Sequence, residues 1–161
     1  MGSVISTIEC PQCGGLYTTD YYYKTGEEYR SCARCGRHEE WEIVRGEDGK
    51  PVLDEKGHWQ MKYELSDGYG SMRLADKNGF AQIYSLSQPV DQDLIDDFNR
   101  ALEDPDIDKD GSYLSSWDPE KKELVMIYGK MPESFAEFDE RVSKEEAADE
   151  QIAAVSESSG T

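Results

Sequence analysis

Residues 10–14 read Cys-Pro-Gln-Cys-Gly, and residues 32–36 read Cys-Ala-Arg-Cys-Gly. Each stretch is a C-x-x-C-G unit, and eighteen residues separate Cys13 from Cys32. A C-x-x-C turn brings two sulfurs to one side of a tight loop, and the following glycine permits a positive φ that turns backbone amides toward the thiolates. The two units therefore predict a tetrahedral set of four thiolates, Cys10, Cys13, Cys32 and Cys35, which is a geometry that zinc favours.

The segment between the two units predicts a β-hairpin. Residues 17–23 and residues 27–30 flank a turn that contains Gly26. Aromatic and β-branched residues around a glycine-containing turn are typical of two paired strands. A third strand is expected over residues 40–43, where acidic and apolar residues alternate.

This layout resembles the zinc-ribbon family of the C-P-x-C-G type over residues 1–45. The resemblance implies a role in binding nucleic acid or in docking onto proteins of the transcription and translation machinery. Four thiolates also fill a tetrahedral coordination sphere, so that no position is left for water or substrate. We therefore expect one structural zinc ion, Zn2+, per chain, whose binding provides free energy for folding this segment.

Other readings of the four cysteines have less support. Two disulfides need an oxidising compartment, and the sequence shows no secretion signal. A redox C-x-x-C motif is usually found near a βαβ pattern, which is absent here. Iron bound by the same four thiolates stays open as an alternative to zinc. Reduced cysteines without an export signal indicate a cytoplasmic protein.

The charge of the chain is unevenly distributed. The 161 residues hold 17 Lys+Arg and 35 Asp+Glu, which gives a formal net charge of −18. Residues 1–45 carry a net charge of −2, so that residues 46–161 carry −16. Because nucleic-acid binding relies on Lys and Arg that neutralise phosphates, any such contact is expected within the first 45 residues. The candidate contact residues, for nucleic acid or for a partner, are Lys24, Arg30, Arg34 and Arg37.

The remaining chain alternates strand and helix patterns. Residues 46–57 are rich in turn residues and predict a linker or a long hairpin tip. Residues 58–65 alternate with period two, which predicts a half-buried strand. A second hairpin is expected around Asn78-Gly79, a helix over residues 90–102 with Asp91 as its N-cap, and a third hairpin over residues 113–128.

A last helix is expected to begin at Ser134, with Glu137 completing a capping box, and to fray beyond Lys144. The sequence thus predicts an α+β fold: an N-terminal zinc ribbon, a small and mainly antiparallel sheet with one packed helix, and a C-terminal helix. We divide the chain into a ribbon at 1–45, a linker or hairpin tip at 46–57, an α+β domain at 58–143 and an acidic disordered tail at 144–161.

One further motif suggests a metal. Residues 106–111 match the first half of a calcium loop of the EF-hand type, with Asp106, Asp108 and Asp110 as candidate ligands. The twelfth position of such a loop requires a bidentate glutamate, but here it is Trp117. An acidic loop between a helix and a strand explains the same residues without calcium.

The sequence favours binding over catalysis. It contains no phosphate-binding loop, no nucleophile motif and no apolar run long enough to span a membrane, so we expect neither an enzyme nor a membrane protein. The first hypothesis is an interaction or adaptor module that binds another protein. The alternatives are a nucleic-acid-binding protein that uses the ribbon, and an acidic mimic of nucleic acid that inhibits a basic partner.

Overall fold

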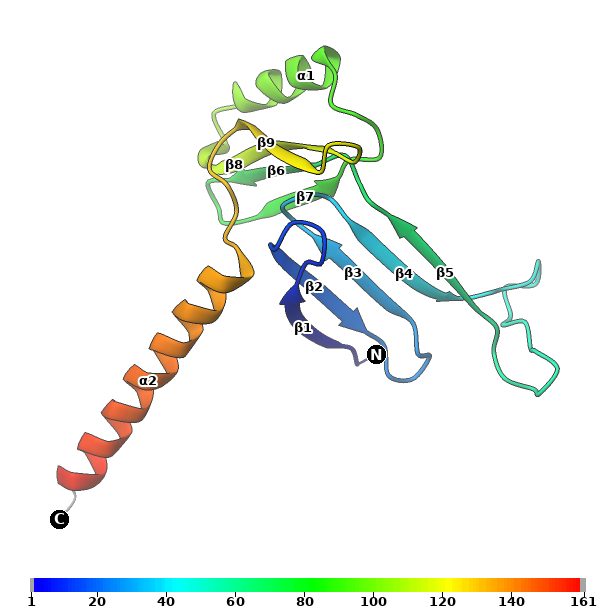
Figure 1. Ribbon diagram of the computed structural model, residues 1–161, viewed down its shortest axis with the longest axis horizontal. Helices are drawn as coiled ribbons and strands as arrows, with labels where there is room; N and C mark the ends of the chain where they lie inside the picture. The colour runs from blue at the N-terminus through cyan, green and yellow to red at the C-terminus, as the bar shows by residue number, and fades with distance from the viewer. Residues whose placement is uncertain (1, 160–161) are drawn as a thin grey trace.

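The computed structural model describes the backbone of residues 2–159 and the side chains of residues 2–149. The fold is α+β, with two antiparallel sheets and two helices (Figure 1). The first sheet contains, in spatial order, β1 Val4–Glu9, β2 Leu16–Tyr21, β3 Glu28–Cys32, β4 His38–Ile43 and β5 Met61–Ser66. The second sheet contains β7 Ala81–Ser85, β6 Ser71–Asp76, β8 Ile107–Asp118 and β9 Glu123–Tyr128. The helices are α1 Gln92–Leu102 and α2 Phe135–Ser159.

The first sheet extends beyond the predicted ribbon at both edges. The hairpin β2–β3 and the strand β4 lie where the sequence predicted them, whereas β1 was not predicted. The strand that we assigned to the second domain, β5, instead pairs with β4, with Trp41 opposite Tyr63. Residues 44–60 form the tip of this hairpin, since Val44 N donates to Gln60 O at 2.9 Å. The first sheet therefore runs to Ser66, past the expected boundary at residue 45.

The second sheet holds the main apolar core. Phe98 and Leu102 of α1 are buried with Leu114 of β8, and Met72 and Leu74 of β6 pack against them. This packing covers one face of the sheet, as expected for an amphipathic helix. Burying the side chains of Phe98 and Leu114 contributes on the order of 1.5–3 kcal/mol each. The predicted hairpins β6–β7 and β8–β9 are both confirmed.

Helix α1 begins with the predicted cap. The side chain of Asp91 accepts a hydrogen bond from Leu94 N at 2.8 Å. We expect Asp91→Ala to lower the free energy of unfolding by about 1 kcal/mol, because an otherwise unpaired amide of the first turn loses its acceptor. Urea denaturation followed by circular dichroism measures this loss. Asp91→Asn keeps a capping oxygen and should stay within a few tenths of a kcal/mol of the wild type; an equal loss in both variants would contradict the cap.

Helix α2 also begins as predicted, because Glu137 N donates to Ser134 Oγ at 3.2 Å. Its backbone is helical to Ser159, whereas the sequence predicted fraying and disorder beyond Lys144. Alanine, glutamate and glutamine have high helix propensity and account for the continuation. Residues 160 and 161 of the expected tail lie outside the described residues. Within the described part, neither helix combines the length and the apolarity that crossing a bilayer requires.

Candidate metal centre

Each C-x-x-C-G unit forms a tight loop between two strands of the first sheet, and we name residues 10–15 the first knuckle and residues 32–37 the second knuckle. In the first knuckle, Cys10 N donates to Gly15 O at 2.9 Å and Gly14 N donates to Cys10 O at 3.0 Å. The second knuckle repeats both bonds, from Cys32 N to Arg37 O at 2.9 Å and from Gly36 N to Cys32 O at 3.1 Å. Gly14 and Gly36 have φ of 74° and 84°, as these turns require.

The two knuckles bring all four sulfurs together. Their Sγ atoms lie within 4.8 Å of one another. Cys10 Sγ lies 3.8 Å from Cys35 Sγ, and Cys13 Sγ lies 3.5 Å from Cys32 Sγ. A tetrahedral metal with metal–sulfur bonds of about 2.3 Å has sulfur–sulfur distances of about 3.8 Å. The four cysteines are thus positioned to coordinate one metal ion, and they form the single cluster of this kind among the described side chains.

Hydrogen-bond donors surround the sulfurs. Cys10, Cys32 and Cys35 are buried and Cys13 is half-buried. Three sulfurs accept N–H groups of the knuckles: Cys13 from Gly15 N at 3.4 Å, Cys32 from Arg34 N at 3.4 Å, and Cys35 from Gln12 Nε2 at 3.3 Å. Such donors stabilise thiolates, which are the form of cysteine that binds a metal. The contribution of Gln12 was not predicted from the sequence.

The four thiols form hydrogen bonds with one another and thereby shift one another's pKa. Hydrogen bonds from Cys13, Cys32 and Cys35 hold the pKa of Cys10 below the ordinary value of a thiol. Hydrogen bonds to the other three sulfurs, with a further contribution from burial, raise the pKa of Cys35 above it. A bound metal ion replaces these protons, so metal affinity falls as the pH is lowered.

The second knuckle is fastened to the second sheet. Three hydrogen bonds join them: Gly70 N to Cys35 O at 3.0 Å, Tyr113 Oη to Ala33 O at 2.6 Å, and Ser115 Oγ to Arg34 O at 2.9 Å. Trp117 of β8 is buried in one cluster with Tyr17 and the cysteines. None of these contacts was predicted, because their partners lie far apart in the sequence. The metal centre is therefore part of the junction between the two sheets.

The first knuckle contacts the start of α2. Gly15 pairs with Ser134 in an isolated β-bridge, and Phe135 N donates to Gly14 O at 2.9 Å. The segment that leads into α2 is thus held within one residue of the ligand Cys13. The first sheet, β8 of the second sheet and the start of α2 thus all contact the two knuckles that carry the four cysteines.

The predicted basic contact residues differ in whether their side chains already contact other residues of the chain. Arg30 pairs with Glu28 at 3.3 Å, and its guanidinium lies 4.9 Å from the ring centroid of Trp41. Arg37 pairs with Glu39 at 2.9 Å and with Asp67 at 3.7 Å.

The other two predicted contact residues are Lys24 and Arg34. Lys24 is exposed in the β2–β3 turn, and the side chain of Arg34 lies against Gly15. Of the four basic residues, Lys24 is exposed and Arg30, Arg34 and Arg37 are half-buried.

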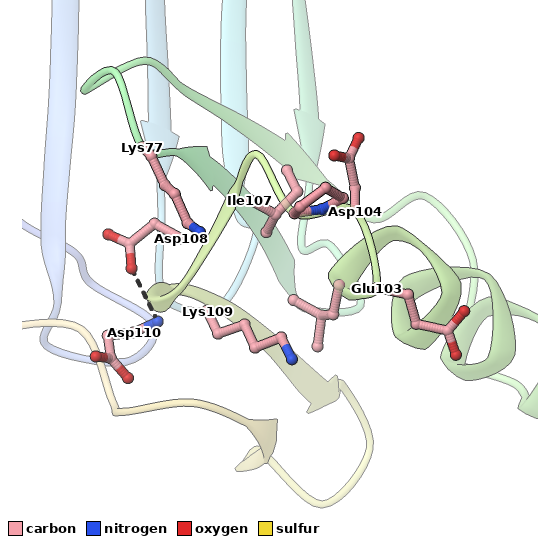
Figure 2. A pocket seen from close by; sticks show the side chains of 9 residues that line it. Lys77, Glu103, Asp104, Ile107, Asp108, Lys109 and Asp110 are labelled. Carbon is pink, nitrogen blue, oxygen red and sulfur yellow. Dashed lines mark hydrogen bonds between the residues drawn. The ribbon is translucent and has the colours of Figure 1, made fainter.

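The predicted calcium ligands lie at the start of strand β8 and just before it. Strand β8 begins at Ile107 and places Asp108 opposite Ala75 of β6, so that strand replaces the expected loop. Asp108 accepts a hydrogen bond from Asp110 N at 3.1 Å, and both residues line an open groove beside Lys77 and Lys109 (Figure 2). Asp106 does not line this groove. The three carboxylates form no cluster with the spacing of metal ligands among the described side chains.

Comparisons of the chain with protein-family models, with curated proteins and with solved structures found no match.

Proposed function

We propose that this protein is a non-enzymatic interaction or adaptor module that binds another protein and in which one structural zinc ion stabilises the junction of two sheets. The observation that carries the proposal is the set of four cysteines, three buried and one half-buried, whose sulfurs lie within 4.8 Å of one another at the junction of those sheets. Zinc favours four thiolates in a tetrahedron, and four protein ligands leave no site for substrate. Iron remains the alternative metal for the same ligands.

The charges support a protein partner over nucleic acid. The net charge of −18 repels phosphates, and Arg30 and Arg37 are already paired with carboxylates. The nucleic-acid hypothesis retains Lys24, Arg34 and the tyrosines of the first sheet. Aromatic side chains can stack on bases without regard to sequence.

Fluorescence anisotropy with labelled single-stranded and duplex oligonucleotides at low salt tests the proposal. We expect no saturable binding, or an apparent Kd weaker than about 100 μM, because the net charge of −18 opposes the approach of phosphates.

The contrary result is salt-sensitive binding by the metal-loaded protein that Lys24→Glu with Arg34→Glu abolishes without loss of metal. These two positions are preferred over Arg37, whose ion pairs are structural. Lys50→Glu with Lys56→Glu, at exposed positions in the tip of the β4–β5 hairpin, changes the net charge equally and serves as the control.

A further inference from the structure

The hairpin β4–β5 exposes an apolar face. Met61, Tyr63 and Leu65 of β5 lie on one face and are 42%, 51% and 47% exposed. The ring centroid of Trp41, which lies opposite Tyr63, is 4.8 Å from that of Tyr63. The period-two pattern predicted a half-buried strand, but β5 pairs only with β4, and neither helix lies against it (Figure 1). A second strand that pairs with β5 would place its own side chains beside this apolar row, where cross-strand contacts stabilise a sheet.

The outer edge of β5 is also open. Val44 N donates to Gln60 O, so the even-numbered residues of β5 direct their backbone groups toward β4. The odd-numbered residues Met61, Tyr63 and Leu65 therefore direct their N–H and C=O groups outward. Such an unpaired edge is a template for another strand.

The sequence of β5 is self-complementary about Tyr63. Residues 61–65 read Met-Lys-Tyr-Glu-Leu, with opposite charges on either side of the tyrosine. In an antiparallel pair of two such strands centred on Tyr63, Lys62 of each copy lies opposite Glu64 of the other. Met61 then lies opposite Leu65. Because the N–H and C=O groups of Tyr63 point outward, the two copies of Tyr63 form a hydrogen-bonded pair. Lys62 and Glu64, one residue to either side, then occupy non-hydrogen-bonded positions, where side chains approach most closely.

The carboxylate of Glu64 lies beside another carboxylate within its own chain. Glu64 lies directly opposite Glu40 of β4, and like charges at such positions are unfavourable. Within one chain Lys62 Nζ approaches Glu64 Oε1 at 2.7 Å. A lysine from another chain beside Glu64 relieves this repulsion.

We propose that two copies of this chain associate through antiparallel pairing of their β5 strands about a two-fold axis at Tyr63, which forms one continuous sheet of ten strands. The interface is isologous, since the same five residues contact each other in both copies. The net charge of −18 per chain opposes association, but the charges of Lys62 and Glu64 cancel within β5, and the Debye length is about 8 Å at physiological salt. A single strand pair is small for an interface, so we expect a reversible dimer.

The choice of a second copy follows from the charges. A nucleic acid brings phosphates to Glu40 and Glu64, and an unrelated protein strand has no reason to match the alternation of Lys62 and Glu64. The proposal concerns self-association, so a chain that merely stays monomeric leaves the proposed function intact, and the oligonucleotide titration tests that function separately.

Sedimentation velocity over a range of protein concentrations, with the metal-loaded full chain, tests the proposal. The wild type should show a concentration-dependent dimer. Lys62→Glu alone and Glu64→Lys alone should each weaken the dimer about tenfold or more, because both opposite-charge pairs become like-charge pairs. Lys144→Glu on α2 changes the net charge as Lys62→Glu does and should leave the dimer within about twofold of the wild type, because Lys144 lies far from β5 along the chain and is exposed.

The decisive experiment mixes the Lys62→Glu variant with the Glu64→Lys variant. The glutamate introduced at position 62 of one chain then faces the lysine introduced at position 64 of the other, and the unchanged Lys62 and Glu64 also face each other. The mixture should therefore form a heterodimer with an affinity near that of the wild type. The double exchange of Lys62→Glu with Glu64→Lys should also restore the homodimer. Lys62 and Glu64 are exposed, so we expect all of these variants to fold. The double exchange also leaves the net charge of the chain unchanged.

Three results overturn the proposal. The first is a wild type that stays monomeric at every concentration. The second is a dimer that the single variants retain or that the mixture fails to restore, since β5 is then absent from the interface or paired in another register. The third is a monomer that binds an oligonucleotide and loses this binding on Tyr63→Ser, because the apolar face is then a nucleic-acid surface and the proposed function fails as well.

Discussion

Replacing Cys32 by serine should remove the bound metal and unfold the second sheet together with the first. Structural zinc sites in zinc-finger peptides bind with about 10–16 kcal/mol, whereas a whole domain is stable by about 5–15 kcal/mol. Losing one of four ligands therefore removes enough free energy to abolish the native state. The second sheet follows because Gly70 N, Tyr113 and Ser115 are bonded to the second knuckle.

Native mass spectrometry, with and without chelator, measures the metal content, and hydrogen exchange reports on each sheet. The amide of Gly70 is the informative probe, since it belongs to the segment of the second sheet but donates to Cys35 O. Ser31→Ala, at the exposed position beside Cys32, is the matched control and should keep metal and protection. A metal-free Cys32→Ser chain with full protection at Gly70 would show that the cysteines have no structural role.

Gly36→Ala, in the loop between β3 and β4, should lower the free energy of unfolding strongly. Gly26→Ala, in the turn between β2 and β3, should lower it far less. Both glycines have positive φ, of 84° and 78°, so both alanines carry a left-handed penalty of about 1–2 kcal/mol. A Cβ on Gly36 would lie 2.1 Å from Gly70 O, whereas a Cβ on Gly26 meets nothing within 4 Å. Gly36→Ala must therefore also separate the second knuckle from the second sheet, which we expect to cost about 3 kcal/mol more.

Urea denaturation of both variants isolates this difference, because the backbone penalty is shared and cancels. Metal content should fall in Gly36→Ala, since Gly36 follows the ligand Cys35 directly, and should stay unchanged in Gly26→Ala. Equal losses of stability in the two variants would mean that the close approach of Gly36 to Gly70 contributes nothing to the junction.

Local patterns predicted the local structure. The four cysteines that are positioned to coordinate a metal follow from two C-x-x-C-G units, whose turns are closed by bonds within six residues. The cap at Asp91 and the hairpin turn at Asn78-Gly79 are equally local, because their hydrogen bonds join residues a few positions apart. Such features depend on the conformational preferences of short segments, which a single sequence expresses directly.

Sheet membership was less predictable. The alternation over residues 58–65 indicates a strand but is equally compatible with either sheet, and only the pairing of Trp41 with Tyr63 places β5 beside β4. The edge strand β1 was not predicted, although it is rich in β-branched residues. The helical continuation of α2 beyond Lys144 shows the opposite case, in which intrinsic propensity persists where we expected disorder.

The sequence by itself determined the four cysteines of the candidate metal centre, the hairpins β2–β3, β6–β7 and β8–β9, and the start of each helix, because each depends on residues close together in the chain. Only the tertiary structure decided that the second knuckle lies against Gly70 and Ser115, that the metal centre therefore joins two sheets, and that the apolar face of β5 is left exposed. A periodic pattern specifies that a face is apolar. What covers that face depends on backbone pairing and packing between segments that are distant in sequence, and a local pattern carries no record of those partners.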